Sequence, residues 1–302
     1  MERVLTIQDL SCVGKCSLTA ALPVLSVMGV EACALPTAVL STHTMFSDVY
    51  LRDLTEDMLR VAAHWQAKQI RFNALYSGYL ASERQAALTQ ELFRMFGGEG
   101  VKIIVDPAMA DGGKLYSGFD AAFPAAMRGL CARADVVLPN LTEAAMLLQR
   151  PYPGEDCGVQ TVLELARLLT DGGPSCAVVT GVRFPDGMIG AVGFDRTAGE
   201  AFEARAKRVR GKFHATGDLF SAALTGGLVR GLSVKRAAEL AACFVSESLR
   251  QTPADRPDAF GPCFELALPW LAERLDAALR QDASFAHTAN DEIMRQKEKF
   301  NL

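Results

Sequence analysis

The sequence predicts a single large α/β domain with a mostly parallel central sheet and helices on both faces. Three observations predict this fold class. Short apolar runs alternate with helix-like stretches of about ten to fifteen residues almost from end to end, a pattern typical of βαβ units. Half of the 302 residues are hydrophobic and 22% are charged, which is enough apolar material for a large core. Because no linker-like stretch divides residues 1–282, we expect one domain there, followed by a polar tail or peripheral helix over residues 283–302.

The first half of the chain predicts four strands separated by helices. Apolar runs that stop at polar or turn residues indicate strands at residues 4–7, 31–35, 73–77 and 101–105. Ser or Thr residues open the stretches between them, which predicts helices at residues 17–28, 55–68 and 82–97. Gly29 is well placed to end the first of these helices. Residues 36–48 are polar, and we expect them to be irregular.

The second half continues the alternation and then becomes helical. Short strands are expected at residues 136–138 and 176–179, with a helix from residue 142 onward. Two apolar runs flank the turn-forming segment 195–199, which predicts a β-hairpin of residues 188–194 and 200–206. The last third is expected to form helices at residues 217–230, 234–249 and 264–279.

Charge and cysteine content argue against several classes of function. The chain carries 31 Lys and Arg residues against 35 Asp and Glu residues, and its net charge of −4 gives no general footprint for nucleic acid. The eight cysteines are scattered without a CxxC pair, so we expect reduced thiols and no zinc site. The sequence shows no signal peptide and no run of the ~20 apolar residues that span a membrane. We therefore expect a cytoplasmic protein without a nucleic acid or membrane partner.

Polar, small and acidic residues follow the predicted strands, one group after another. In an open α/β sheet, ligands bind outside the carboxyl ends of the strands, so these residues are expected to meet at one edge. In chain order they are Asp9, His43 with Thr44, Tyr79, Asp106 with Asp111, Asn140 with Glu143, and Thr180 with Gly181.

The sharpest local signal is the segment Ala215, Thr216, Gly217 and Asp218, directly before an apolar helical run. Small residues at a helix N-terminus let successive backbone N–H groups point at one spot, where the helix dipole adds positive charge. This arrangement predicts an anion hole, with Asp218 as a candidate base that deprotonates a hydroxyl attacking a phosphoryl group. The alternative is that Asp218 only caps the helix.

Five segments are informative as a set: Ser-Thr-His-Thr at 41–44, Ser-Gly-Tyr-Leu at 77–80, Asp-Pro-Ala-Met-Ala-Asp at 106–111, Pro-Asn-Leu-Thr-Glu at 139–143 and Ala-Thr-Gly-Asp at 215–218. They occur in the order found in the pyridoxal kinase family of the ribokinase-like superfamily, and the chain resembles that family over about residues 1–280. The opening Asp-Leu-Ser-Cys-Val-Gly-Lys-Cys-Ser-Leu-Thr resembles a bacterial branch called pyridoxamine kinase.

The resemblance implies a ribokinase-like three-layer sandwich and a kinase of vitamin B6 salvage. Such an enzyme uses ATP and Mg²⁺ to phosphorylate the 5′-hydroxymethyl group of pyridoxal, pyridoxamine or pyridoxine. The resemblance also suggests a homodimer.

The resemblance further implies a role for each residue of the predicted edge. Asp218 would be the catalytic base, with the anion hole at Ala215, Thr216 and Gly217. The B6 vitamer would contact Asp9, His43, Thr44 and Tyr79. ATP would contact Asp106, Asp111, Asn140, Glu143, Thr180 and Gly181. Asp106 and Glu143 would also hold Mg²⁺, through water.

Two departures from the family pattern keep alternatives open. Ala215 stands where many members have Gly, and Asp9 aligns where members often carry Ser. One alternative is a kinase of the same fold that acts on another hydroxymethyl heterocycle, such as hydroxymethylpyrimidine, or on a sugar-like alcohol. The other is a non-catalytic relative that binds a B6 vitamer or a nucleotide.

Overall fold

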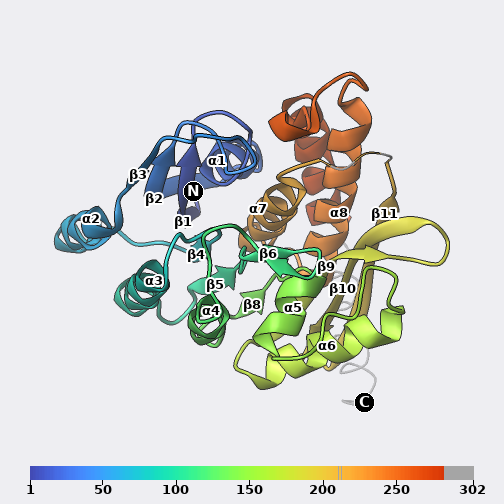
Figure 1. Cartoon of the computed structure of the whole chain (residues 1–302), viewed down its shortest axis with the longest axis horizontal. Coiled ribbons are helices and arrows are strands. Elements are labelled where there is room, and N and C mark those ends of the chain that lie inside the picture. The colour runs from blue at the N-terminus through green and yellow to red at the C-terminus, as the bar shows by residue number, and fades with distance from the viewer. Residues whose placement is uncertain (210, 212, 282–302) are drawn as a thin grey trace, which may run out of the picture.

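The centre of the computed structural model, which describes residues 1–209, 211 and 213–281, is a nine-stranded sheet (Figure 1). Its strands are β1 (Arg3–Ser11), β2 (Glu31–Leu40), β3 (Leu51–Asp53), β4 (Ala74–Ser77), β5 (Lys102–Val105), β8 (Val136–Val137), β9 (Cys176–Arg183), β10 (Met188–Asp195) and β11 (Glu200–Lys207). Their order is β11-β10-β9-β8-β5-β4-β1-β2-β3. The six strands from β9 to β2 run parallel, while β3, β10 and β11 pair antiparallel with their neighbours.

Helices cover both faces of the sheet, which confirms the predicted fold class. On one face lie α1 (Leu18–Val27), α7 (Thr216–Val229), α8 (Val234–Gln251) and the helical residues 268–281. The other face carries α2 (Thr55–Ala67), α3 (Glu83–Phe96), α4 (Phe123–Cys131), α5 (Leu141–Leu147) and α6 (Val159–Asp171). Side chains alternate along each strand, so Val4 enters the core of the first face and Leu5 that of the second.

Three predicted strands are longer in the structure. β1 continues through Asp9 to Ser11, and β2 continues through Pro36 to Leu40, so the expected irregular segment begins later than residue 36. Pro36 is tolerated because β3 pairs with β2 only over 38–40, which leaves no strand outside Pro36 to accept an N–H bond. β9 continues past Thr180 and Gly181 because β10 pairs with it as far as Arg183.

Two helices and one small hairpin were not expected from the sequence. Helix α4 has nine residues, contains Gly129 and lacks a capping side chain, and α6 begins after Gly158 without one. The hairpin joins β6 (Ala110–Asp111) to β7 (Lys114–Leu115). Without an N-capping residue or a long apolar run, these elements carry few local signals.

Several expectations concern the whole chain. All eight cysteines are free. Across residues 1–209, 211 and 213–281, no helix is both long and apolar enough to cross a membrane. The predicted C-terminal tail, residues 283–302, lies outside the described residues. Two short 3-10 helices, η1 (Asp258–Phe260) and η2 (Phe264–Ala267), lead from α8 to the last helical segment.

Candidate active site

The N-terminus of α7 lies at the centre of the candidate site. Ala215 is the N-cap residue, and its left-handed conformation, with φ 65° and ψ 12°, turns the chain sharply into the helix. The first N–H groups of a helix have no partner within it, so those of the turn that begins at Thr216 are available to an anion. A positive φ on alanine stores about 1 kcal/mol of strain.

Asp218 lies in the first turn of α7 and is held by the start of a second helix. Its Oδ1 accepts a hydrogen bond from the backbone N–H of Ser17 at 3.1 Å. Ser17 is the N-cap of α1 and has a positive φ of 48°. The N-termini of α1 and α7 therefore meet at the Asp218 carboxylate. Asp218 thus accepts a bond from another element, which a helix-capping role does not require.

Burial, together with the charges of Asp106 and Asp9, raises the pKa of Asp218 to about 8. Hydrogen bonds from backbone groups, including that of Ser17, act in the opposite direction. A carboxylate with a pKa near neutrality can take a proton and release it again at physiological pH, which a general base must do. Three predicted site residues are therefore close enough to share one electrostatic environment.

Asp106 follows β5 and faces α7. Burial raises the pKa of Asp106 to about 6, and a hydrogen bond from the Ser221 hydroxyl lowers it in part. Ser221 is on α7, so the Asp106 carboxylate lies near the helix that carries Asp218. The Asp106 residue as a whole is half-buried.

Glu143 is almost fully buried and is used by the protein itself. Its Oε1 accepts bonds from the N–H groups of Met109 at 3.0 Å and Ala110 at 3.4 Å, and its Oε2 accepts one from Asn140 at 2.8 Å. Burial and the charge of Asp106 raise the pKa of Glu143, while these three N–H groups oppose that shift. The carboxylate thus fixes the segment after Asp106.

Asn140 and Glu143 form a capping box at the start of α5. The Asn140 side chain accepts from the Glu143 N–H at 3.0 Å and donates to the carbonyl of Ala110 at 2.7 Å. Asn140 also forms a β-bridge with Thr180, so the ends of β8 and β9 lie together. Next to Thr180, Gly181 has a φ of 74° and is exposed.

Asp111 is exposed at the end of β6, directly before the turn of the β6–β7 hairpin. Its Oδ1 accepts a bond from the N–H of Gly112 at 2.8 Å. The hairpin is tied to α5, because Thr142 accepts a bond from the N–H of Gly113 at 3.0 Å. Asp111 is therefore on the same side of the sheet as Asn140 and Glu143, at the outer limit of the predicted set.

Asp9 is buried in β1, and its charge is close enough to act on Asp218. The Ser11 hydroxyl donates to its Oδ2 at 2.8 Å. Burial raises the pKa of Asp9, while hydrogen bonds from Ser17 and Ser11 lower it in part. Tyr79 is half-buried nearby: burial and the charge of Asp9 raise its pKa to about 12.

His43 is buried, and both of its ring nitrogens contact the protein. Its Nε2 lies 2.6 Å from the carbonyl oxygen of Ala259, and its Nδ1 accepts from the N–H of Met45 at 3.3 Å, so the proton belongs on Nε2. The ring stacks on His214, with centroids 3.9 Å apart. A Cβ on Gly14 would lie 2.1 Å from the His43 ring, so only glycine fits there. Thr44, the next residue, is exposed.

The structure thus groups the predicted residues into two linked sets. Asp9, Asp106 and Asp218 influence one another electrostatically around the starts of α1 and α7. Asn140, Glu143 and Thr180 are joined by hydrogen bonds and a β-bridge. Whether any of these residues contacts a ligand stays a prediction.

Three residues with contacts at this site were not expected from the sequence: Ser17, Tyr76 and Ser221. Ser17 was visible only as an opening residue of a helix, and Ser221 only as a small residue in an apolar run. Tyr76 is part of an apolar strand, and nothing local marks its hydroxyl as important. Their partners lie 145 to 201 residues away along the chain.

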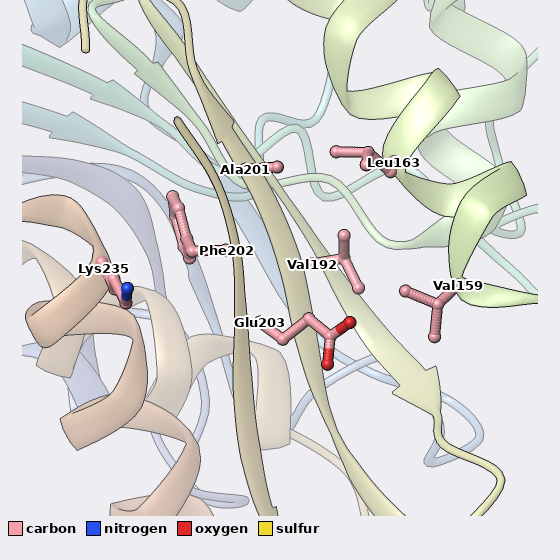
Figure 2. A pocket seen from close by; sticks show the side chains of 7 residues that line it. All are labelled: Val159, Leu163, Val192, Ala201, Phe202, Glu203 and Lys235. Atoms are coloured by element: carbon pink, nitrogen blue, oxygen red, sulfur yellow. The ribbon is translucent and has the colours of Figure 1, made fainter. Parts of the chain in front are cut away.

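A separate cavity of about 340 Å³ lies at the β10–β11 edge of the sheet, lined by residues of α6, α8, β10 and β11 (Figure 2). Its walls are formed by Val159, Leu163, Val192, Ala201, Phe202, Glu203 and Lys235. Val192 of β10 pairs with Val179 of β9, and Ala201 of β11 pairs with Phe194 of β10. The residues that line this cavity include none of the predicted site residues.

Residues 13–262 match the protein family described as phosphomethylpyrimidine kinase. The chain is 28% identical over 254 residues to a hydroxymethylpyrimidine/phosphomethylpyrimidine kinase of Mycobacterium leprae, covering 82% of this chain and 88% of that one. It is 29% identical over 185 residues to a yeast protein, from Saccharomyces cerevisiae, provisionally named a pyridoxal kinase. That match covers 53% of this chain and only 52%, about half, of the yeast protein.

Two solved structures are similar over nearly the whole chain. One is a protein of Bacteroides thetaiotaomicron, provisionally described as a phosphomethylpyrimidine kinase and crystallised with pyridoxal. It shares 33% identity and a TM-score of 0.84, covering 91% of this chain and 96% of that one. The other is pyridoxal kinase from Lactobacillus plantarum, with 32% identity, a TM-score of 0.82 and coverage of 90% and 96%.

Proposed function

The chain belongs to the phosphomethylpyrimidine kinase family and is a kinase of the pyridoxal or hydroxymethylpyrimidine type, and from this premise we propose that it phosphorylates the 5′-hydroxymethyl group of a B6 vitamer. The family membership agrees with the resemblance found in the sequence motifs, and the non-catalytic alternative is not retained. The observation that carries the proposal is Asp218, held by Ser17 at the N-terminus of α7 beside the turn at Ala215.

Asp218 is the general base of the proposed reaction. The bond from Ser17 fixes Oδ1, so Oδ2 is the oxygen that takes the proton from the substrate hydroxyl. The hydroxyl oxygen then forms a bond to the γ-phosphorus of ATP while the bond from that phosphorus to the bridging oxygen breaks, which leaves ADP. The N–H groups of the turn at Thr216 and Gly217 stabilise the negative charge on the transferring group.

The acidic residues near the site fit a magnesium ion that is held mainly by water and phosphate. Among residues 1–209, 211 and 213–281, no three His, Cys, Asp or Glu side chains gather closely enough to hold a metal alone. Mg²⁺ commonly uses one or two carboxylates together with waters and substrate phosphates. Asp106 would contact it, and Glu143, whose oxygens accept protein N–H bonds, would act through water. Bound there, Mg²⁺ neutralises phosphate charge.

The second linked set is proposed to hold ATP. Asn140, Thr180 and Gly181 lie together at the ends of β8 and β9, and Asp111 lies on the adjacent hairpin. The positive φ of exposed Gly181 lets the backbone approach a nucleotide closely. Glu143 supports this set by fixing the turn at Asn140.

The substrate ring is proposed to lie beside Asp9, His43, Thr44 and Tyr79. The aromatic ring of Tyr79 and the carboxylate of Asp9 offer an apolar face and an acceptor for a ring or amino N–H. Asp9 also supports a second candidate substrate, hydroxymethylpyrimidine, because a carboxylate can accept two N–H bonds from an aminopyrimidine.

Product analysis tests the proposal and separates the two substrates. The full chain is incubated with Mg²⁺-ATP and pyridoxal, pyridoxamine, pyridoxine or hydroxymethylpyrimidine, and the phosphorylated alcohol is detected by mass spectrometry. We expect transfer to at least one B6 vitamer with a higher kcat/KM than for the pyrimidine. Preferential phosphorylation of the pyrimidine would replace the proposed substrate.

We further propose that residues 1–282 form the catalytic domain and that the enzyme is a homodimer. A chain truncated after residue 282 is expected to keep the Tm and kcat of the full chain. Sedimentation of the full chain is expected to give twice the mass of 32.5 kDa. A truncated chain that does not fold, or a monomeric full chain, would refute the respective statement.

A further inference from the structure

Tyr76 and Ser221 form a buried pair of hydroxyl groups between β4 and α7. Tyr76 is 0% exposed and Ser221 is 1% exposed, and their oxygens lie 2.6 Å apart. The mechanism described above uses neither side chain. A buried hydroxyl without a partner is costly, and phenylalanine would fill nearly the same volume as Tyr76. The phenol oxygen therefore requires an explanation beyond packing.

Ser221 links this phenol to the reactive turn. Its Oγ lies 3.0 Å from the carbonyl oxygen of Gly217 and 3.3 Å from that of Asp218. A serine hydroxyl has a single proton. When Ser221 donates that proton to any of these acceptors, Tyr76 must donate to Ser221. In that arrangement the two hydroxyl groups form a chain of hydrogen bonds that runs from Tyr76 in the sheet, through Ser221, to the first turn of α7.

The two ends of this chain differ in rigidity. Tyr76 is in the middle of the sheet, paired with Thr6 of β1 on one side and Ile104 of β5 on the other. The first turn of α7 follows the positive φ of Ala215 and begins with residues that have no intrahelical N–H partner. The Tyr76–Ser221 bond opposes a movement of this turn away from the sheet.

We propose that Tyr76 and Ser221 are positioning residues that hold Gly217 and Asp218 at the distance from the substrate that phosphoryl transfer requires. This inference rests on the proposed kinase activity of the α7 N-terminus. Small displacements of a reacting group reduce turnover more than they reduce binding. Loss of the pair should therefore lower kcat and leave the KM values almost unchanged.

The test compares Tyr76→Phe and Ser221→Ala with a matched control. Ser248 is also a buried serine that donates to the carbonyl four residues earlier in its helix, Phe244 at 2.8 Å, but it is on α8. We expect kcat to fall about tenfold in both test variants, with KM for ATP and the alcohol within about twofold. Ser248→Ala should keep the wild-type kcat, and Ser221→Thr, which retains a hydroxyl, should restore most of it.

A second readout does not depend on turnover. Hydrogen–deuterium exchange at residues 216–219 should be faster in Tyr76→Phe and Ser221→Ala than in the wild type and in Ser248→Ala. Folded test variants with wild-type kcat and unchanged exchange would overturn the inference. A wild-type chain that phosphorylates no alcohol would refute the proposed function instead, and the exchange comparison would still test the positioning role. If Tyr76→Phe does not fold, Ser221→Ala decides the question.

Discussion

At the scale of single residues, Asp218 combines a proposed catalytic position with an environment that disfavours its charge. Burial and the nearby Asp106 and Asp9 raise its pKa to about 8 from 3.8. Between about pH 4 and pH 8 the folded chain therefore binds more protons at Asp218 than the unfolded chain does. It follows that this carboxyl lowers the stability of the folded state as pH rises through that window.

This sign gives a prediction for Asp218→Asn. The amide keeps an oxygen for the Ser17 N–H and removes the charge. We expect the variant to be about as stable as the wild type at about pH 4 and clearly more stable at about pH 9, as measured by Tm. A difference in Tm that stays constant between the two conditions would show that Asp218 is ionised normally in the free protein.

Ala215 gives a second prediction at this scale. Because its φ is 65°, glycine would remove the strain and the methyl group next to the proposed anion hole. We expect Ala215→Gly to raise kcat about tenfold, or about 1.4 kcal/mol, with a smaller change in KM for ATP. Steady-state kinetics measure both. An unchanged or lower kcat would mean that alanine holds this turn without a catalytic cost.

Asp9 is predicted to select the alcohol and not the nucleotide. Asp9 is in β1, where it is buried close to Tyr79, whereas the proposed ATP residues lie at the ends of β8 and β9. Asp9→Ser should change KM for the B6 vitamers and for hydroxymethylpyrimidine while KM for ATP stays within about twofold. The largest loss is expected for substrates with an amino group. A change confined to the KM of ATP would place Asp9 in the other pocket.

At the scale of elements, the start of α5 determines the shape of the segment after Asp106. Glu143 accepts N–H bonds from Met109, Ala110 and Asn140, so a glutamine would turn an N–H donor toward at least one of them. We expect Glu143→Gln to cost about 2 kcal/mol of unfolding free energy and to raise KM for ATP. Glu83→Gln, an exposed acid in the first turn of α3, is the control and should change neither.

The same scale shows what the sequence could predict. Elements with a local signal, such as α3 with its Ser82 cap and the hairpin of β10 and β11, were expected within a few residues. The predicted strand for β2 ended before Pro36, although the structure continues it to Leu40. A proline on the side of a strand that no neighbouring strand covers has the same sequence signal as a proline that ends a strand. Helices α4 and α6 were not expected because no side chain caps them.

At the scale of the whole molecule, the parallel sheet explains why the motif residues could be predicted as a set. Strands that run the same way deliver their carboxyl ends to one edge, so residues that follow different strands come together. The bonds within that set could not be predicted. The contact of Ser17 with Asp218 spans 201 residues and that of Tyr76 with Ser221 spans 145, and only the packing of α1 and α7 on the sheet creates them.

The central claim is that Asp218 takes the proton of a hydroxymethyl group during phosphoryl transfer from ATP. The most direct measurement is the turnover of a B6 vitamer by the wild type and by Asp218→Asn under saturating Mg²⁺-ATP. The account predicts that the variant folds, binds ATP normally and turns over at least about 100-fold more slowly, the usual scale for a general base. Turnover within a few fold of the wild type would contradict the account and leave Asp218 as a helix cap.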